Sequence, residues 1–293
     1  MRAFDYDKAF SRNIGWVTEA EQARLRTSRA AIGGLGGVGG VHLLTLARMG
    51  VGRFTIADLD SFDIVNFNRQ VGARVGTLGR PKIDVLAEMA RDINPEIDLR
   101  VFPAGIQGDT LDGFLDGVDV YVDGLDFFAF DARRATFAAC ERKGIPVVTA
   151  APLGLGAALL VFGPGGMPFE EYFGFAECES EIEMAIRFMV GLSPAMLQRG
   201  YVADMSRVRL AERLGPSCIA ACQLCAGVAA VEVLKLLLKR NGVKLAPWAS
   251  QFDAYRMRYA KTWRPWGHRN PLQRLMVFLV NAQLARGAVK TER

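Results

Sequence analysis

The sequence predicts an α/β fold with a doubly wound, mainly parallel sheet, and three observations lead to this prediction. Short apolar segments alternate with helical segments between residues 29 and 162. A glycine-rich turn joins the first of these strands to the first long helix, as in nucleotide-binding sheets. Hydrophobic residues make up 51% of the 293 residues and charged residues 23%, so the chain has enough apolar surface for a packed core.

The elements follow one another in the order strand, helix, strand, which places helices on both faces of a parallel sheet. The expected strands span residues 29–33, 53–58, 97–102, 119–123, 146–150 and 157–162. The expected helices between them span residues 38–49, 81–94 and 130–143. Pro81 suits a first helical turn, and Gly144 suits a helix end, because proline lacks an amide hydrogen and glycine accepts a left-handed conformation.

A long crossover segment, residues 163–215, interrupts this rhythm, and we expect it to cross or cover the site. It begins with glycines, becomes aromatic over residues 167–175 and then acidic. The aromatic stretch could grip an extended peptide or pack a lid, and packing is the better interpretation. A C-terminal helix and strand extension follows, with a helix at 218–239 and a strand at 250–259. We therefore expect one domain over 1–263 and a basic helical extension over 264–293.

The basic extension carries the whole charge excess of the chain. It holds six Lys or Arg residues and one acid, Glu292, while the net charge of the full chain is +5. The body is therefore balanced, whatever the overall pI. The extension could contact nucleic acid or an acidic partner, or it could be a solvated helix.

Several function classes are disfavoured by composition. No uninterrupted apolar run has the length of about 18–20 residues that a membrane span needs, and the charged start of the chain has no apolar core typical of a secretory signal. Five cysteines are too few and odd in number for a disulfide framework, so we expect a soluble, cytoplasmic protein without a membrane partner. With only His42 and His268 available, a hydrolytic triad is disfavoured.

The glycine turn is the first functional motif. Its sequence fits G-x-G-x-x-G between a strand and a helix, a pattern whose backbone amides approach phosphates. Asp58 ends the next strand, at the position where an acid binds ribose hydroxyls. This motif alone fits a nicotinamide or flavin enzyme, an ATP user, or a tight packing turn. The glycines concerned are Gly34, Gly36, Gly37 and Gly39.

Three later features of the sequence distinguish between these interpretations of the glycine turn. Asn66 and Arg69 follow the second strand, Lys82 stands in the first turn of a helix, and Asp126 follows a strand at its carboxyl end. Hydride transfer has no need for these charges around the phosphates. Adenylate transfer does, because the charge of a triphosphate must be neutralised while pyrophosphate leaves.

At these residues the chain resembles the ThiF/MoeB/HesA superfamily, which includes the ubiquitin-activating enzymes. The resemblance covers about residues 10–162 and 226–235. It implies a Rossmann-like fold and an ATP-dependent adenylyltransferase that joins a substrate carboxylate to AMP with release of pyrophosphate. It also implies residue roles: the four glycines, Asp58 and Asp60 would hold the nucleotide, Asn66, Arg69 and Lys82 would contact phosphates, and Asp126 would bind Mg²⁺.

The resemblance extends to the amino terminus. Ser11-Arg12-Asn13 is similar to the Ser-Arg-Gln of the family, whose arginine reaches the ATP of the partner subunit. Arg12 therefore implies a homodimer with composite sites, and it joins Arg69, Lys82 and Asp126 as an expected catalytic residue.

The chain also departs from the family pattern. Many relatives hold a structural zinc with two C-x-x-C pairs, but only Cys222 and Cys225 have that spacing, so zinc is disfavoured and a buried helix face is the simpler interpretation. Cys178 lies in the crossover segment, where some relatives carry a catalytic thiol, yet acidic neighbours oppose its activation. Phe127 replaces the Asn that commonly follows the metal-binding Asp.

Two substrate classes fit this resemblance. The first is the C-terminus of a small ubiquitin-like or sulfur-carrier protein, or of a peptide. The second is a tRNA nucleoside, as in threonylcarbamoyladenosine dehydratases, which the basic extension would suit. An NAD-dependent oxidoreductase rests on the glycine turn alone, and a non-catalytic scaffold leaves the complete set of ATP-site residue types unexplained.

Overall fold

The computed structural model describes residues 4–291 and shows one mixed sheet of eight strands in the order β3-β2-β1-β4-β5-β6-β7-β8. The first five strands in this order run parallel, whereas β6, β7 and β8 pair antiparallel with their neighbours. The expected doubly wound, mainly parallel sheet is thereby confirmed. The strands are β1 (Arg29–Gly33), β2 (Arg53–Ala57), β3 (Asp98–Phe102), β4 (Val120–Asp123), β5 (Val147–Pro152), β6 (Gly156–Phe162), β7 (Trp248–Asp253) and β8 (Arg258–Trp263).

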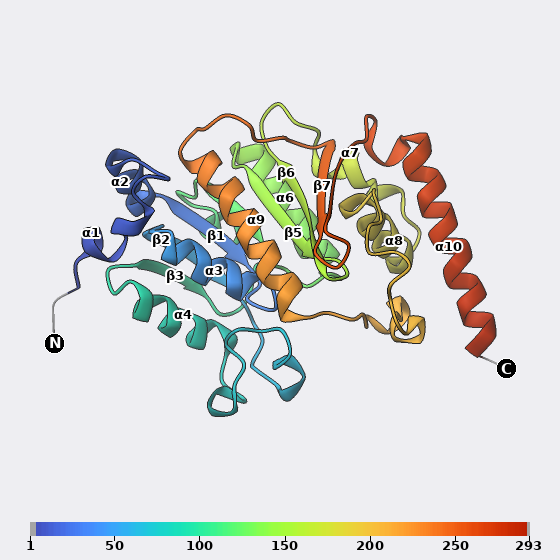
Figure 1. The fold of residues 1–293 in the computed structure, drawn as a ribbon, viewed down its shortest axis with the longest axis horizontal. Helices are drawn as coiled ribbons and strands as arrows, with labels where there is room; N and C mark the ends of the chain where they lie inside the picture. The colour runs from blue at the N-terminus through green and yellow to red at the C-terminus, as the bar shows by residue number, and fades with distance from the viewer. Residues whose placement is uncertain (1–3, 292–293) are drawn as a thin grey trace.

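Helices cover both faces of the sheet (Figure 1). One buried core joins the strands to α3, α4 and α9, and a second joins them to α5, α6, α7 and α8. The helices are α1 (Tyr6–Ala9), α2 (Glu19–Thr27), α3 (Gly39–Arg48), α4 (Lys82–Ile93), α5 (Leu111–Phe114), α6 (Phe130–Lys143), α7 (Phe169–Phe173), α8 (Glu181–Leu192), α9 (Ile219–Leu237) and α10 (Pro271–Thr291).

The local signals in the sequence placed most of these boundaries. Pro81 is the residue at which α4 begins, and Gly144 ends α6 in the left-handed conformation with φ of 66°. The parallel strands lie within one residue or two of the ranges expected from hydrophobic periodicity. The order of strands reverses direction between β1 and β4, which creates a switch point at the carboxyl edge of the sheet.

The expected single strand at 250–259 is wrong, because the structure forms a hairpin there. Strands β7 and β8 pair antiparallel, and the chain turns between them with Met257 at a φ of 49°. Asp253 starts this turn by accepting a hydrogen bond from the amide of Arg256 at 2.8 Å. Alternation continues on both sides of the turn, and the turn contains no glycine or proline, so the pattern of residues concealed it.

The crossover segment packs as an aromatic layer. All four of its central rings are buried, which favours packing over an open peptide-gripping surface: Phe169, Tyr172, Phe173 and Phe175. The C-terminal extension follows β8 and forms α10, which packs on α8 through a cluster that includes Ile186, Val190 and Val280. Residues 292 and 293 of the expected extension lie outside the described residues.

Helix α9 is long and strongly apolar. Among residues 4–291 it is the one helix long and apolar enough to cross a membrane by length and composition, with a mean hydropathy of 1.7. The count of uninterrupted apolar runs in the sequence did not single it out. In the structure α9 packs against α3 and strands β4, β5 and β6, and Cys225, Ala229 and Val233 face the core.

Candidate functional site

The glycine turn lies at the switch point of the sheet, between the ends of β1 and β4. A Cβ atom at Gly39 would stand 1.8 Å from the carbonyl oxygen of Gly34, and one at Gly124 would stand 2.5 Å from the same oxygen. Gly34 itself has a φ of 80°. These glycines let the turn pack directly on the backbone of the loop that follows β4. The turn and that loop therefore form one unit.

Gly36 and Gly37 have a different environment, because side chains face them rather than backbone. A Cβ at Gly36 would lie 3.7 Å from Gln70 Nε2, and one at Gly37 would lie 3.1 Å from Cys222 Sγ and 3.6 Å from Arg69 Cγ. The structure thus brings Arg69 beside the glycine turn, as the sequence predicted. Gly36 and Gly37 are half-buried, and backbone amides of such a turn are the groups that bind phosphates in nucleotide-binding folds.

Asp58 braces the glycine turn. Its Oδ2 accepts a hydrogen bond from the Leu35 amide at 2.6 Å, and its Oδ1 accepts one from the Asp60 amide at 2.8 Å. Burial raises the pKa of Asp58 despite these two bonds. The carboxylate therefore positions the turn, and its expected contact with a ribose stays a prediction.

The two expected phosphate-binding cations are held in different ways. Lys82 is nearly buried at the start of α4, and its Nζ lies 2.9 Å from Asp60 Oδ2. Arg69 donates hydrogen bonds to the Val65 carbonyl at 2.8 Å and to Asn68 Oδ1 at 3.0 Å. The Asp60 carboxylate therefore neutralises Lys82, whereas the two bonds of Arg69 go to uncharged oxygens.

Asn66 stabilises the local structure after β2, a role that the sequence did not indicate. Its side-chain oxygen accepts a hydrogen bond from the Asp63 amide at 2.9 Å, and the asparagine itself is buried. This bond caps a short 3-10 helix, Ile64–Asn66, in the connection between β2 and α4. The same connection reaches α9, because Asn68 Nδ2 donates to the Ser217 carbonyl at 2.8 Å. Any phosphate contact of Asn66 would have to come from its side-chain nitrogen, Nδ2, because the backbone N–H donates to the Asp63 carbonyl.

The loop after β4 distinguishes two aspartates. Asp123 is buried, and its Oδ2 lies 2.9 Å from Arg133 Nε and 3.0 Å from Thr149 Oγ1. Asp126 is exposed, and its Oδ1 accepts only the amide of Phe128 at 2.9 Å among the hydrogen bonds of residues 4–291. Asp123 is thus committed to the interior, and Asp126 keeps carboxylate oxygen free for a ligand.

Arg133 is a functional-site residue that sequence reasoning missed. It is 2% exposed, and it donates to Asp123 and to the carbonyls of Leu125 and Asp126 at 2.9 Å each. Its guanidinium lies 4.7 Å from the ring centroid of Phe188 in α8. Arg133 therefore holds the loop that carries Asp126 against the crossover segment. The one available signal was its position three residues after Phe130 and four before Phe137, on the apolar face of an expected helix.

The donor set fits a magnesium ion bound together with a nucleotide. Nowhere in residues 4–291 do three His, Cys, Asp or Glu side chains meet in a group that could hold a metal. Mg²⁺ is commonly held by one or two carboxylates together with substrate phosphates and water, so Asp126 alone suits this role.

The structure does not bring Arg12 to the site of its own chain. Arg12 lies in a 3-10 helix, Ser11–Asn13, and the neighbouring Asn13 donates to the Met49 carbonyl at 3.1 Å. Met49 ends α3, whereas the glycine turn begins it, and ten helical residues separate them by about 15 Å. Arg12 is exposed, and its expected contact with the ATP of a partner copy stays a prediction.

The cysteines and histidines provide no activated group beside the turn. Burial raises the pKa of Cys178 to about 11, which opposes its use as a nucleophile. Cys222 and Cys225 are buried on α9, where burial also raises their pKa values. His42 is buried in α3 with its Nε2 unpartnered among the described residues, and burial lowers its pKa to about 4.

The chain is similar in sequence to curated enzymes with two different named activities. The chain is 34% identical over 141 residues to the tRNA threonylcarbamoyladenosine dehydratase of Bacillus subtilis, which covers 48% of this chain and 55% of that protein. It is 33% identical over 150 residues to the sulfur carrier protein ThiS adenylyltransferase of Escherichia coli, covering 51% and 58%. The chain thus spans a little over half the length of these curated relatives.

The structure is similar to that of E. coli MccB with ATP, with a TM-score of 0.60 over 83% of this chain and 65% of that one. The identity of 18% in this alignment supports a shared fold alone. The ThiF family matches residues 10–275, nearly the whole described chain. The resemblance that the motifs indicated is therefore confirmed, and the chain belongs to the ThiF family.

Proposed function

We propose that this protein is an ATP-dependent adenylyltransferase that activates a carboxylate. The observation that carries the proposal is the packing of the glycine turn directly on the loop that presents Asp126. A Cβ at Gly34 would lie 2.4 Å from the Gly124 carbonyl oxygen, so the backbone of the glycine turn lies directly against the loop that carries the proposed metal ligand. The sulfur carrier protein ThiS adenylyltransferase of E. coli, a family relative, is named for an activity of this kind.

The proposed reaction joins a carboxylate oxygen of the substrate to the α-phosphorus of ATP. The bond from that phosphorus to the bridging oxygen breaks, and pyrophosphate leaves with the bonding electrons. Turn amides near Gly36 and Gly37 would bind phosphate oxygens, and Arg69 beside them would offset the charge of the leaving group. Asp58 would keep the turn in place through the Leu35 amide.

Lys82 would act by changing partner. Its ammonium group is paired with Asp60 and is 7% exposed, so it is already desolvated and held in position. A phosphate oxygen that replaced the Asp60 carboxylate would pair with the same ammonium group. Because that group is already held in place, binding would not carry the cost of ordering a flexible side chain. When bound through Asp126, Mg²⁺ would neutralise charge on the phosphates.

A homodimer completes the proposal. Arg12 is exposed at the far end of α3 and lies too distant to serve its own chain. We propose that it enters the site of a partner copy and contacts ATP there. The cytoplasmic location expected from the sequence also stays a proposal.

The test is exchange of radiolabelled pyrophosphate into ATP, with a small carrier protein ending in Gly-Gly and a short peptide as candidate substrates. The variants Lys82→Met and Asp126→Ala should each reduce exchange at least about a hundredfold, because each removes a charge from the phosphate site. Lys143→Met is the matched control, since Lys143 pairs with Asp112 on the surface. Exchange that survives both site substitutions would refute the residue roles.

A cofactor comparison tests the reaction class itself. ATP with magnesium should raise the melting temperature of the protein, and NADH should leave it unchanged. Stabilisation by NADH together with no effect of ATP would instead identify a dinucleotide enzyme and overturn the proposal.

The threonylcarbamoyladenosine dehydratase activity is a second candidate, favoured by the relative in B. subtilis. The basic residues that favour tRNA lie in the C-terminal extension, and its last ten residues hold three of them, Arg286, Lys290 and Arg293. Binding of modified tRNA should then weaken steeply with salt and on removal of residues 284–293. Salt-insensitive binding, or binding unchanged by the truncation, would exclude this role for the extension.

A further inference from the structure

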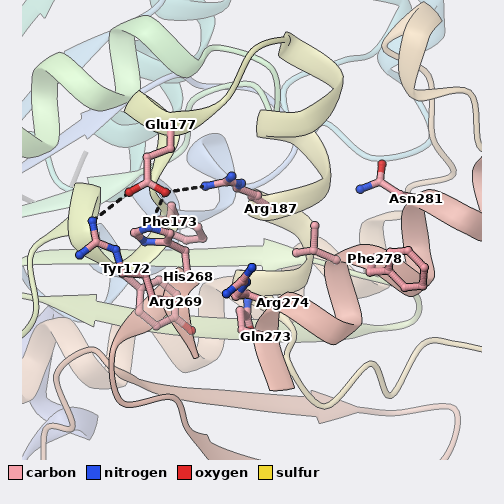
Figure 2. Close-up of a pocket in the computed structure, with 11 residues that line it drawn as sticks. Tyr172, Phe173, Glu177, Arg187, His268, Arg269, Gln273, Arg274, Phe278 and Asn281 are labelled. Atoms are coloured by element: carbon pink, nitrogen blue, oxygen red, sulfur yellow. Dashed lines mark hydrogen bonds and ion pairs between the residues drawn. The ribbon is translucent and has the colours of Figure 1, made fainter. Parts of the chain in front are cut away.

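A cavity of about 600 Å³ lies between the crossover segment and α10. Helix α10 forms one wall, and α7, α8 and the 3-10 helices Phe175–Glu177 and Gly267–Arg269 form the others (Figure 2). Cavities of several hundred Å³ are the size that encloses small organic ligands. None of its lining residues belongs to the proposed nucleotide site.

The cavity has an apolar part built from the crossover segment and from α10. Tyr172 and Phe173 contribute buried rings from α7, while Val277 and Phe278 contribute from α10. Phe278 is 67% exposed, and Leu275, about one turn before it on α10, is 51% exposed. A ligand with an apolar group would cover this ring and remove it from water.

The charged part of the cavity is basic. Three arginines line it against one acid, Glu177, whose carboxylate lies 2.9 Å from Arg269 and 3.0 Å from His268 Nε2. These hydrogen bonds, led by that of Arg269, lower the pKa of Glu177, which therefore stays ionised. Arg187 lies 3.8 Å from the same carboxylate and 2.8 Å from Glu183. The acid is thus already satisfied by its neighbours.

The third arginine that lines the cavity is Arg274. Within residues 4–291 no carboxylate pairs with its guanidinium, and Figure 2 shows the side chain extending from α10 toward the cluster around Glu177. An anion placed here would meet a charge that has no partner of its own. Bidentate pairing with a carboxylate is the geometry that an arginine side chain favours.

Gln273 adds an independent polar signal. It lines the cavity and is 4% exposed, and its Oε1 has no hydrogen-bond partner in the described structure. A buried amide oxygen without a partner is unfavourable by an amount comparable to a lost hydrogen bond. A ligand that carries an N–H group next to its carboxylate would supply the missing donor.

We propose that this cavity binds an organic carboxylate that carries an apolar group and an adjacent N–H, such as the last residue of a peptide with an apolar side chain. The carboxylate pairs with Arg274, the N–H donates to Gln273, and the apolar side chain packs on Phe173 and Phe278. The binding site is separate from the proposed adenylation site and does not depend on it.

The test uses N-acetylphenylalanine as the probe and its uncharged amide as the comparison, with binding measured by titration calorimetry on the full chain. The acid should bind, and the amide should bind at least about tenfold more weakly, because it lacks the charge that pairs with Arg274. Phenyl phosphate is included to separate carboxylate from phosphate recognition. Tighter binding of phenyl phosphate than of the acid would overturn the carboxylate assignment.

Three variants locate the probe. Arg274→Gln should weaken binding of the acid about tenfold and leave the amide unchanged, whereas the control Arg142→Gln, on the exposed end of α6, should alter neither. Lys82→Met should also leave binding intact, since Lys82 lies in the nucleotide site. Equal affinity for acid and amide, no effect of Arg274→Gln, or loss of binding in Lys82→Met would each overturn the proposal.

Discussion

The glycine turn and the crossover segment achieve close packing by opposite means. In the turn, residues without side chains allow backbone to meet backbone, as where a Cβ at Gly39 would lie 1.8 Å from the Gly34 carbonyl oxygen. In the crossover segment, rings interlock, and Phe173 and Phe188 have their centroids 5.1 Å apart. Gly34 and Gly39 of the turn therefore tolerate no added atom, whereas the ring layer can adjust to a side chain of similar volume.

The two regions meet at Arg133, so its replacement should have the largest effect. Arg133→Met leaves Asp123 as an unpaired buried charge and frees the loop that carries Asp126. We expect the free energy of unfolding to fall by about 3–5 kcal/mol. Urea unfolding measures this loss, and the double variant Arg133→Met with Asp123→Asn should recover a substantial part of it. A double variant as unstable as the single one would show that the ion pair is not the cause.

A change of pH should weaken the side of the sheet that carries the glycine turn. His42 in α3 is buried, and its pKa is lowered to about 4 in the folded protein. Below the unfolded pKa of about 6.5, the unfolded chain binds a proton that the folded chain excludes, so stability is full above that pH and is lost as pH falls toward 4.

The contribution of this one group over that range is about 3 kcal/mol. Urea unfolding of the native protein and of His42→Leu, each at pH 7 and pH 4.5, isolates it. The variant should lose less stability on acidification by roughly that amount. Equal losses in the two proteins would show that His42 does not sense the change.

The smallest effect is expected where the ring layer adapts. Phe188 contacts Phe127 at 5.1 Å between ring centroids and lies over Arg133. Phe188→Leu should lower the free energy of unfolding by less than about 1.5 kcal/mol and leave pyrophosphate exchange largely intact. Gly39→Ala adds a single methyl group and should be far more damaging, as thermal unfolding of the two variants would show. Similar losses would remove the distinction between the two regions.

Most of the fold could be predicted from the sequence because its signals are local. Strand and helix periodicity, Pro81 and Gly144 act over a few residues, and the elements they mark are present. The glycine turn, Asp58 and Arg69 come together as expected because parallel strands end at one edge of the sheet. The hairpin at 254–257 was hidden because its turn uses Asp253 rather than glycine or proline.

The rest depends on contacts between distant parts of the chain. The pairing of Asp123 with Arg133, and the position of Phe188 above it, join three elements whose sequence spacing carries no motif. The cavity likewise draws on residues 172–187 and 268–281, which only the packing of α10 on α8 brings together. Arg12 is placed by Asn13 and Met49, and no local pattern indicates at which end of α3 it would lie.

The pairing of Lys82 with Asp60 has a consequence for how nucleotide affinity should respond to ionic strength. Because the ammonium group already has a carboxylate counterion 2.9 Å away, an arriving phosphate replaces one anion with another. The net charge gained at this position on binding is small, so added salt competes with both states alike. Nucleotide affinity should therefore decline with salt less steeply than a simple count of nearby cations suggests, with Arg69 as the main contributor.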